Sequence, residues 1–492
     1  MGLKLLELMK GIEYSLKSGD IEIDITGITY DSRKVKAGFL FVCISGFRTD
    51  GHMFIDQAIQ NGAAAVLAEK EVDVRAEAAL CLTSSTRQAL AIAAGNFYQH
   101  PSRALRVIGV TGTNGKTTTT HLIKAILDEA GYKTSIIGTL YGMIGSQAAE
   151  MGHTTPEAPE LEEFMLSSLQ AGVQYAIMEV SSHALDLYRV DGIDFNSAVF
   201  TNLTQDHLDY HQTMHNYLLS KLKLFNRLAV KDSNFTVVNG DDGAAQEFIK
   251  ASANHCYTYG INKNADVRAE NVKTGMKGST FKVKWTKGEF IINMKLIGIF
   301  SIYNALAAIC FALGEGIQTD IIKSALEKVE GVAGRFETVN CGQKFSVIVD
   351  YAHTPDGLEN ILSTARSITP NRLICLFGCG GDRDRTKRPL MGEVAARYAD
   401  FCVVTSDNPR SEDPQAIIND IIPGLEKVPD SRYAIIIDRR EAIHHALNLA
   451  REGDMVIIAG KGHETYQLVK GIKYDFDDRK IAAEILKGMK KK

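Results

Sequence analysis

The stretch from residue 105 to residue 127 constrains the fold of this chain more than any other. It reads as a buried strand (LRVI), a glycine-rich turn (GVTGTNGKTTTT) and a helix (HLIKAIL). This order is typical of a phosphate-binding loop, in which glycines let backbone N–H groups face inward and the helix N-terminus adds partial positive charge. Lys116 would add a full charge, and the Thr117 hydroxyl could hold Mg²⁺. The glycine spacing departs from the common pattern, and the alternative is a glycine-rich turn with a surface lysine.

Length and composition limit the classes of protein to consider. The chain has 492 residues, too many for one hydrophobic core, so we expect about two to four domains. A net charge of −4 argues against general binding to nucleic acid or to membrane surfaces. The eight cysteines are scattered without a C-x-x-C pair, which indicates reduced thiols rather than a zinc site or disulfides. No apolar run is long enough to span a bilayer and no signal peptide is recognisable, so we predict a cytoplasmic location.

The first unit, residues 1–98, reads as a small α/β domain. Residues 25–33 read as a strand that runs into a polar turn, further strands are expected at 38–44 and 63–68, and helices are expected near 52–61 and 87–98. Ser32 falls in the polar turn that follows the first of these strands. It could contact a ligand or merely close the turn.

The second unit, residues 99–332, alternates strands with helices, which predicts a doubly wound, mostly parallel sheet. Ligands of such sheets bind at the carboxyl ends of the strands. Glu179 ends one apolar strand and is therefore a candidate Mg²⁺ ligand, unless it is paired within the fold. His207 follows another strand, where a lone histidine more often satisfies local hydrogen bonds. Residues 265–297 read as hairpins, and a helix is expected around 303–309.

The third unit, residues 333–492, begins after a glycine-bounded segment at 331–334. Four apolar strands, at 347–349, 373–377, 401–404 and 455–458, each lead into a charged or glycine-rich loop. This predicts a second doubly wound, Rossmann-like domain whose working edge lies on one side. The run GCGG at 378–381 lacks the complete G-x-G-x-x-G of a dinucleotide site, so that signal is weak.

Five motifs, taken in order along the chain, resemble those of the Mur ligase family. They are GTNGKTT at 112–118, EVSSH at 179–183, DHLDYH at 206–211, NALAA at 304–308 and DYAHTP at 350–355. The resemblance covers nearly the whole chain, domain sizes included. It implies three domains: an N-terminal domain that binds a UDP-linked substrate, a central ATP-binding domain and a C-terminal domain that binds an amino acid. A sixth motif, DNPR at 407–410, resembles the signature of the members that add meso-2,6-diaminopimelate.

The resemblance implies an ATP-dependent amide ligase of peptidoglycan precursor synthesis. Such an enzyme joins meso-2,6-diaminopimelate to the D-Glu side-chain carboxylate of UDP-N-acetylmuramoyl-L-Ala-D-Glu through an acyl phosphate. The implied cofactors are ATP and Mg²⁺. We expect a monomer in the cytoplasm that has no nucleic-acid or membrane partner.

The resemblance also assigns nucleotide and metal positions. Those expected to contact ATP are Gly112, Thr113, Asn114, Gly115, Lys116, Thr117, Thr118, Asn304 and Asp350. The expected metal ligands are Thr117, Glu179, His207 and Lys221, the lysine as a carbamate, and Lys116, Lys221, His207 and Glu179 form the expected catalytic set. An ammonium group cannot ligate a cation, whereas a carbamate supplies two anionic oxygens. On the residues alone, Lys221 would be an ordinary lysine on a helix surface.

Two further groups of positions follow from the resemblance. Those for the UDP-linked substrate are Ser32, Thr154, Thr155, Ser181 and Arg189; Leu187 stands where some members have glutamine. Those for diaminopimelate are Arg383, Asp407, Asn408, Pro409, Arg410, Gly460 and Glu464. An arginine can fork onto the distal carboxylate that lysine lacks, and a glutamate can hold the distal ammonium. The alternative for Arg410 is a structural ion pair.

Four other functions remain open on the sequence. The first is a lysine-adding member of the same family. The second is a folylpolyglutamate synthase-like ligase, which would need neither the N-terminal domain nor residues 407–410. A nucleotide-gated binding protein and a small-molecule kinase are the others, and the binding protein would leave Lys221 and the loops of the third unit without a purpose. For a ligase, we also expect the third unit to close on the second about residues 331–334.

Overall fold

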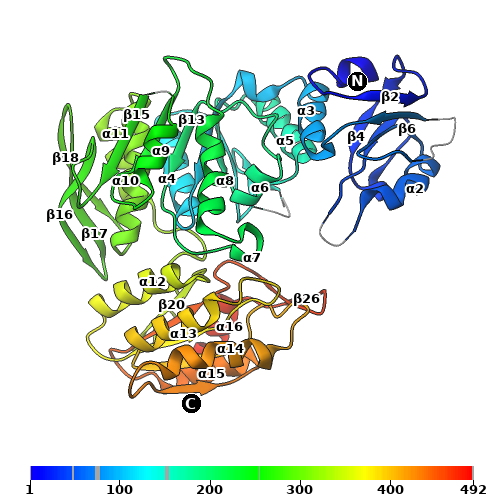
Figure 1. Cartoon of the computed structure of the whole chain (residues 1–492). Helices are drawn as coiled ribbons and strands as arrows, with labels where there is room; N and C mark the ends of the chain where they lie inside the picture. The colour runs from blue at the N-terminus through cyan, green and yellow to red at the C-terminus, as the bar shows by residue number, and fades with distance from the viewer. Residues whose placement is uncertain (1, 47–48, 73–77, 150–153, 254, 490–492) are drawn as a thin grey trace.

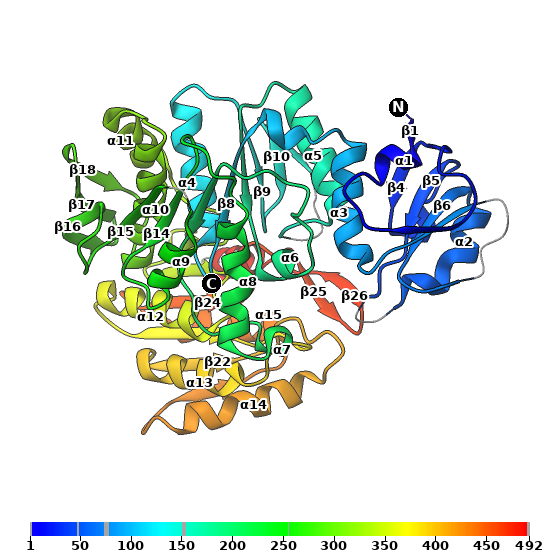
Figure 2. The same ribbon diagram turned by 45° about the horizontal axis from the view of Figure 1, so that its top comes forward.

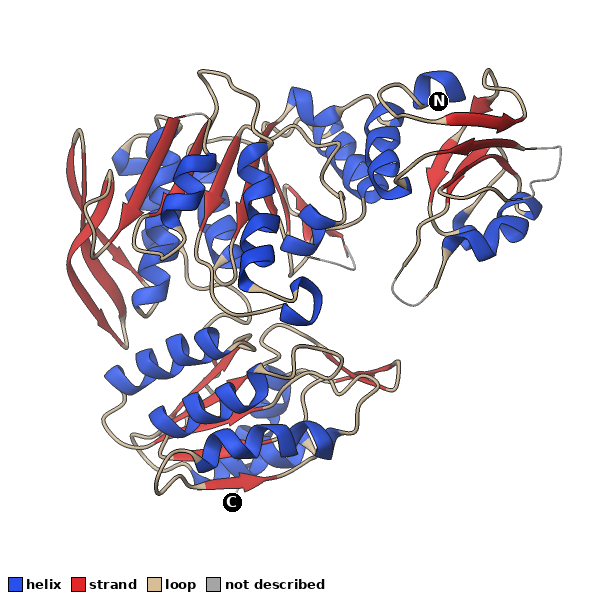
Figure 3. Cartoon of the chain, in the orientation of Figure 1, coloured by secondary structure: helices blue, strands red, loops and turns tan. Residues whose placement is uncertain are grey.

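The computed structural model describes residues 2–46, 49–72, 78–149, 154–253 and 255–489, which form three large sheets, one in each domain, and two two-stranded sheets (Figure 1). The N-terminal domain lies at one side of the central domain, and the C-terminal domain lies against another side (Figure 3). We retain 1–98, 99–332 and 333–492 as the proposed domain boundaries. Within the described residues, none of the helices has both the length and the apolar character needed to cross a membrane.

The N-terminal domain is built on a five-stranded sheet of order β2-β7-β6-β5-β4. Its strands are β2 (Ser15–Ser18), β4 (Gly27–Thr29), β5 (Phe39–Val42), β6 (Ala63–Ala68) and β7 (Ala79–Leu82). Two short strands, β1 (Leu3–Lys4) and β3 (Asp24–Ile25), pair separately, and the helices are α1 (Leu5–Leu8), α2 (Ile55–Gln60) and α3 (Thr86–Phe97). The apolar run of β6 fits its central position, since such a strand is covered on both faces. The predicted strands and helices of this unit are confirmed.

The central domain contains an eleven-stranded sheet of order β11-β10-β9-β12-β8-β13-β14-β15-β16-β17-β18. The strands are β8 (Arg106–Thr111), β9 (Thr134–Ile137), β10 (Gly142–Ile144), β11 (Gln147–Ala149), β12 (Tyr175–Glu179), β13 (Ser197–Phe200), β14 (Phe235–Asn239), β15 (His255–Gly260), β16 (Val267–Gly275), β17 (Gly278–Trp285) and β18 (Gly288–Met294). Seven neighbouring strands, in the order β9-β12-β8-β13-β14-β15-β16, pair in parallel, as predicted, whereas β10 and β11 pair antiparallel at one edge. The predicted hairpins are β16–β18, and they extend this same sheet.

Helices cover both faces of the central sheet, which confirms a doubly wound arrangement. They are α4 (Lys116–Glu129), α10 (Ile299–Gly314) and α11 (Thr319–Lys328) on one face, and α5 (Ala158–Gln170), α6 (Ser182–Asp186), α8 (Met214–Asn226) and α9 (Ala245–Ala251) on the other. A short helix, α7 (Leu208–His211), precedes α8. Strand β8 shows why two layers form: Ile108 packs toward α4, whereas Val107 packs toward α5.

The C-terminal domain has a six-stranded sheet of order β19-β20-β24-β21-β22-β23. The strands are β19 (Glu337–Thr338), β20 (Ser346–Asp350), β21 (Leu373–Phe377), β22 (Phe401–Val404), β23 (Tyr433–Ile435) and β24 (Met455–Ala459). Helices α12 (Pro355–Ile368), α13 (Lys387–Tyr398) and α14 (Pro414–Glu426) cover one face, and α15 (Arg439–Leu449) and α16 (Asp478–Met489) cover the other. A hairpin of β25 (Tyr466–Val469) and β26 (Ile472–Asp475) projects from this domain (Figure 2). The sheet agrees with the Rossmann-like prediction, whereas the hairpin was not predicted.

Candidate active site

One cavity of about 560 Å³ lies between the central and C-terminal domains. Such a volume is typical of a small-molecule site. Eighteen of the residues predicted from the sequence line it: Thr113, Asn114, Gly115, Lys116, Thr117, Thr118, Thr154, Glu179, Ser181, His207, Asn304, Asp350, Arg383, Asp407, Asn408, Arg410, Gly460 and Glu464. The carboxyl ends of strands in two different sheets therefore meet at one site.

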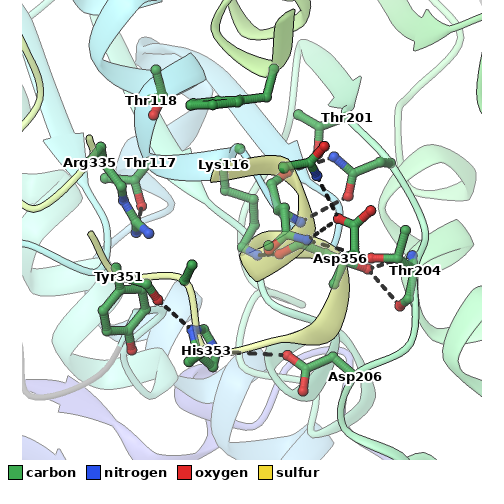
Figure 4. A pocket seen from close by; sticks show the side chains of 18 of the residues that line it. Lys116, Thr117, Thr118, Thr201, Thr204, Asp206, Arg335, Tyr351, His353 and Asp356 are labelled. Atoms are coloured by element: carbon green, nitrogen blue, oxygen red, sulfur yellow. Dashed lines mark hydrogen bonds and ion pairs between the residues drawn. The ribbon is translucent and has the colours of Figure 1, made fainter. Parts of the chain in front are cut away.

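The glycine-rich turn between β8 and α4 lies at one end of this cavity. Gly115 has φ of 87°, and a Cβ there would lie 2.3 Å from Oδ1 of Asn304, so only glycine fits. Lys116 opens α4, and its Nζ donates to the carbonyl oxygens of Gly112 and Thr113 at 2.9 and 2.8 Å (Figure 4). Burial lowers the pKa of Lys116, and the nearby carboxylates of the site partly offset this. The turn thus concentrates backbone and side-chain donors where a phosphate would bind.

Lys221 is a buried residue of α8, with 1% of its surface exposed, so its interpretation as a surface lysine is wrong. Its Nζ donates to the carbonyl oxygen of Gly112 at 2.7 Å and lies 4.5 Å from the centre of the Tyr217 ring. Burial, followed by the charge of Lys116, holds the pKa of Lys221 well below its usual value. A neutral amine is the form that can take up CO₂ as a carbamate.

Glu179 ends β12 beside the phosphate loop and is buried. Its carboxylate accepts hydrogen bonds from the backbone N–H and the hydroxyl of Thr139 at 2.9 and 3.0 Å. In the described part of the chain no lysine, arginine or histidine pairs with Glu179. The carboxylate is therefore oriented by hydrogen bonds while its charge stays available for a cation.

His207 precedes α7 in the left-handed region, with φ of 56°. Burial holds the pKa of its imidazole well below the usual value, although Asp206, 3.3 Å away, opposes this effect. A neutral imidazole can ligate a metal. The described residues contain no group of three or more histidine, cysteine, aspartate or glutamate side chains arranged for a metal. A Mg²⁺ site here would need the Thr117 hydroxyl and a Lys221 carbamate beside Glu179, and oxygen donors of this kind fit Mg²⁺.

Several lining residues escaped the sequence analysis, and they join the two domains. Arg335 donates from Nη2 to the Thr117 hydroxyl at 2.9 Å and stacks on the Tyr351 ring, 4.7 Å from its centre. Asp356 accepts a hydrogen bond from Nδ2 of Asn114 at 2.6 Å. Figure 4 shows these side chains around Lys116. Asp356 directly follows the motif at 350–355 and Arg335 directly follows the glycine-bounded segment at 331–334, so proximity to these stretches was the only available signal.

Asp206 makes a second link between the domains. Its carboxylate lies 3.3 Å from Nζ of Lys387, on α13, and 3.9 Å from Nε2 of His353. Burial alone would raise the pKa of Asp206, but Lys387, His207 and His353 together hold it below the usual range. The charged side chains of two domains are thus paired across the cavity.

The far end of the cavity carries the residues predicted for the amino acid. Asn408 donates from Nδ2 to Glu464 at 2.8 Å, and Nζ of Lys461, which the sequence analysis missed, lies 3.1 Å from both. Asp407 is buried, and its Oδ2 has no hydrogen-bond partner among the described residues. The two carboxylates therefore retain capacity to accept from a ligand ammonium group.

Two arginines lie at the same end of the cavity. Arg410 donates from Nη1 to the carbonyl oxygen of Gly381 at 2.6 Å, and within the described ranges no carboxylate forms a salt bridge with it. The structural ion pair considered for Arg410 is therefore not present there. Burial, followed by the charge of the nearby Arg410 guanidinium, lowers the pKa of Arg383. Pro409 adjoins this end without lining the cavity.

The residues predicted for the UDP-linked substrate fall into two groups. Thr155 accepts from the backbone N–H of Ser181 at 3.1 Å and donates to the Glu179 carbonyl at 2.8 Å, which fixes it beside the cavity. Arg189 lies outside the cavity lining, where its Nε is 2.8 Å from Oε1 of Glu157. Ser32 lies in the N-terminal domain and donates to Gln57 at 2.7 Å. The structure thus brings Thr154, Thr155 and Ser181 to the site but does not bring Ser32 there.

The chain is similar to known proteins over its whole length. Residues 110–312 match the Mur ligase middle domain, residues 334–462 the Mur ligase glutamate ligase domain, and residues 24–98 the Mur ligase family catalytic domain. The chain is 61% identical to a UDP-N-acetylmuramoyl-L-alanyl-D-glutamate–2,6-diaminopimelate ligase of Syntrophomonas wolfei, over 99% of both chains. It is 46% identical to the ligase of that name from Caldanaerobacter subterraneus, over 98% of this chain and 99% of the relative. A solved structure of a ligase with the same name superimposes with a TM-score of 0.69 at 33% identity, over 100% of both chains.

Proposed function

The chain belongs to the Mur ligase family, and we propose that it joins meso-2,6-diaminopimelate to the D-Glu side-chain carboxylate of UDP-N-acetylmuramoyl-L-Ala-D-Glu at the expense of ATP. One observation carries this proposal. A single cavity has a phosphate loop at one end, and two arginines with two carboxylates at the other. Both domains supply charged groups to the space between these ends.

The reaction needs positioning and charge neutralisation more than covalent help from the protein. The D-Glu carboxylate attacks the γ-phosphorus of ATP, which gives an acyl phosphate and ADP. The amino group of diaminopimelate then attacks the acyl carbon, phosphate leaves and the nitrogen loses a proton. The protein must hold both partners and exclude water from the acyl phosphate.

At the phosphate end, Lys116 and the amides of residues 112–118 would neutralise the β- and γ-phosphates. Mg²⁺, when bound, would neutralise part of the negative charge on the phosphate oxygens. Glu179, the Thr117 hydroxyl, His207 and a carbamate on Lys221 would hold it. Asn304 and Asp350 would lie near the nucleoside.

At the amino-acid end, the charges complement a diamino dicarboxylic acid. Arg410 and Arg383 would take the distal carboxylate, and Glu464 and Asp407 would take ammonium groups. Bound lysine would leave Arg410 without a carboxylate partner, at a cost of roughly a few kcal/mol. This difference favours diaminopimelate over lysine.

ADP release by the purified protein tests the proposal. We expect release to require both the UDP-linked dipeptide and meso-diaminopimelate, and to fall strongly when L-lysine replaces the diamino acid. Equal rates with lysine would exclude the selectivity, and ADP release without the dipeptide would indicate a different kinase or switch activity. We also infer that the enzyme acts as a cytoplasmic monomer; light scattering on the purified protein checks the monomer.

A further inference from the structure

Arg388 is a fully buried arginine at the start of α13, beneath the two loops that carry Arg383 and Arg410. Its Nη1 donates to Glu412 at 2.9 Å and to Asp420 at 2.8 Å. Its Nη2 donates to Glu412 at 2.8 Å and to the carbonyl oxygen of Gly380 at 3.3 Å. The guanidinium thus contacts the first loop directly and the second through a carboxylate.

Glu412 is the residue that joins the two loops. It lies two positions after Arg410, and its Oε1 accepts the backbone N–H of Asp382 at 2.6 Å, one residue before Arg383. Asp382 has φ of 52°, a left-handed conformation that needs support in a residue other than glycine. Arg388 supplies the matching charge, and its contact is the main reason that the pKa of Glu412 is lowered. One carboxylate therefore fixes the backbone next to one arginine from a position close to the other.

The two loops are in direct contact with each other. Arg410 donates to the Gly381 carbonyl at 2.6 Å, and the Gly381 N–H donates to the Asn408 carbonyl at 3.0 Å. A Cβ on Gly381 would lie 2.0 Å from the Pro409 carbonyl oxygen, and one on Gly380 would lie 2.7 Å from Nη1 of Arg410. A shift in either loop must therefore move the other.

Helices α13 and α14, which follow the two loops, are also packed closely against each other. A Cβ on Gly424 of α14 would lie 1.7 Å from the carbonyl oxygen of Pro389, and one on Gly392 of α13 would lie 2.5 Å from that of Ile421. Each loop is thus anchored at a helix that cannot slide against its neighbour. At the tips of these loops the two like-charged guanidinium groups of Arg383 and Arg410 repel each other, so their positions depend on this support.

We infer that Glu412 is a positioning residue for amino-acid selectivity: together with Arg388 it holds the loops of Arg383 and Arg410 at the separation at which both guanidinium groups meet one carboxylate of the incoming amino acid. This inference rests on the proposed function. It assigns Glu412 no contact with the substrate. The effect of Glu412 is transmitted through its hydrogen bond with the backbone N–H of Asp382. Two arginines held in position by this contact select a substrate that has a second carboxylate.

Glu412→Ala tests the inference, since its side chain is partly exposed and the variant should fold. We expect the KM for diaminopimelate to rise roughly tenfold while the KM values for ATP and the UDP-linked dipeptide change less than about twofold. The preference for diaminopimelate over lysine should fall by a similar factor. Glu412→Gln should lose less, because an amide oxygen can still accept from Asp382.

Two control variants separate positioning from stability. Asp420→Asn removes the other partner of Arg388 without touching Asp382, so it should lower the melting temperature and leave the KM for diaminopimelate unchanged. Glu393→Gln alters a surface carboxylate that pairs with Arg397, and it should change neither quantity. Equal rises in all three KM values for Glu412→Ala, or an Asp420→Asn variant that matches it, would overturn the inference. A wild-type enzyme without diaminopimelate-dependent ADP release would instead remove the proposed function, and this inference with it.

Discussion

Lys116 and Lys221 direct their side-chain nitrogens at the same acceptor, the carbonyl oxygen of Gly112, at 2.9 and 2.7 Å. They come from different helices, and burial lowers the pKa of both. Two ammonium groups that share one buried oxygen repel each other, which disfavours the charged form of both. Because the pKa of Lys221 is held well below its usual value, we expect this amine, rather than Lys116, to form the carbamate.

Lys221→Ala is expected to reduce turnover by roughly a thousandfold or more, with no rescue by added bicarbonate, because the variant has no amine to carry a carbamate. Lys223→Ala is the matched control: it lies two residues along α8, is partly exposed and pairs with Asp186 at 2.6 Å, and its removal should leave the rate nearly unchanged. Labelled bicarbonate should give a carbamate signal by NMR in the wild type but not in Lys221→Ala. Retained activity, or the same signal in both proteins, would contradict the carbamate.

Arg410→Ala should raise the KM for diaminopimelate by about a hundredfold and change the KM for ATP little, since the side chain lies at the far end of the cavity from the phosphate loop. Activity with lysine should fall much less. Arg385→Ala serves as control, because Arg385 is an exposed arginine of the same domain that pairs with Asp420 at 2.9 Å. Equal effects of Arg410→Ala on both KM values would refute the assignment.

The extent to which the sequence predicted this arrangement differs from residue to residue. Apolar strands that end in polar loops predict parallel sheets and place Glu179, His207 and Asp407 at strand ends, because strand polarity fixes where a loop emerges. Periodicity could not separate Lys221, which is buried, from Lys223, which is partly exposed, since both sit in the run KLKLF. Only the family resemblance distinguished them.

Other features depended on contacts that no local pattern encodes. Arg335 meets Thr117 across 218 positions of the chain, and neither neighbourhood indicates the other. The hairpin of β25 and β26 has no fully buried position, so it lacks the alternation that marks a half-buried strand. The extension of the central sheet by β17 and β18 likewise depends on pairing with β16, which hairpin signals alone do not specify.

Glu162, on α5, predicts an unusual dependence of stability on pH. Its side chain is 1% exposed, and neither oxygen has a hydrogen-bond partner among the described residues. Burial, with a smaller effect of Asp194, raises its pKa to about 8 from an ordinary value of 4.5. Because the pKa of Glu162 is higher in the folded than in the unfolded protein, its contribution to the free energy of unfolding is fully present below the unfolded-state pKa. That contribution is lost as the pH rises through the folded-state pKa. The wild type should therefore lose stability between these two values.

Glu162→Gln removes the titrating group, so its melting temperature should depend less on pH across this window. Near pH 8 the variant should be more stable than the wild type by about 1–3 kcal/mol. Glu163→Gln, at the exposed neighbouring position, is the control and should retain the wild-type dependence. Thermal unfolding at several pH values measures both. A wild-type melting temperature that stayed constant from about pH 5 to about pH 8 would show that Glu162 is ionised in the folded protein.

The hydrogen bond between Asn114 and Asp356 predicts how the domains close. It joins the phosphate loop to α12, and Lys387–Asp206 at 3.3 Å and Gln205–Thr386 at 3.1 Å add two more links across the same boundary. Removal of the Asp356 carboxylate should weaken the closure of the C-terminal domain on the central domain about residues 331–334. We therefore expect Asp356→Ala to have a larger radius of gyration without ligands and a KM for ATP about fivefold higher.

Small-angle scattering can test this closure directly. A nonhydrolysable ATP analogue with the UDP-linked dipeptide should compact the wild type, because the ligands would bind in the cavity between the two domains. Asn360→Ala is the matched control: Asn360 donates to Asp356 at 3.1 Å from within α12, so its loss leaves the link to Asn114 in place. It should scatter like the wild type. If neither the ligands nor Asp356→Ala changes the radius of gyration, these contacts do not govern the arrangement of the domains, and exclusion of water from the acyl phosphate must come from residues within a fixed cavity.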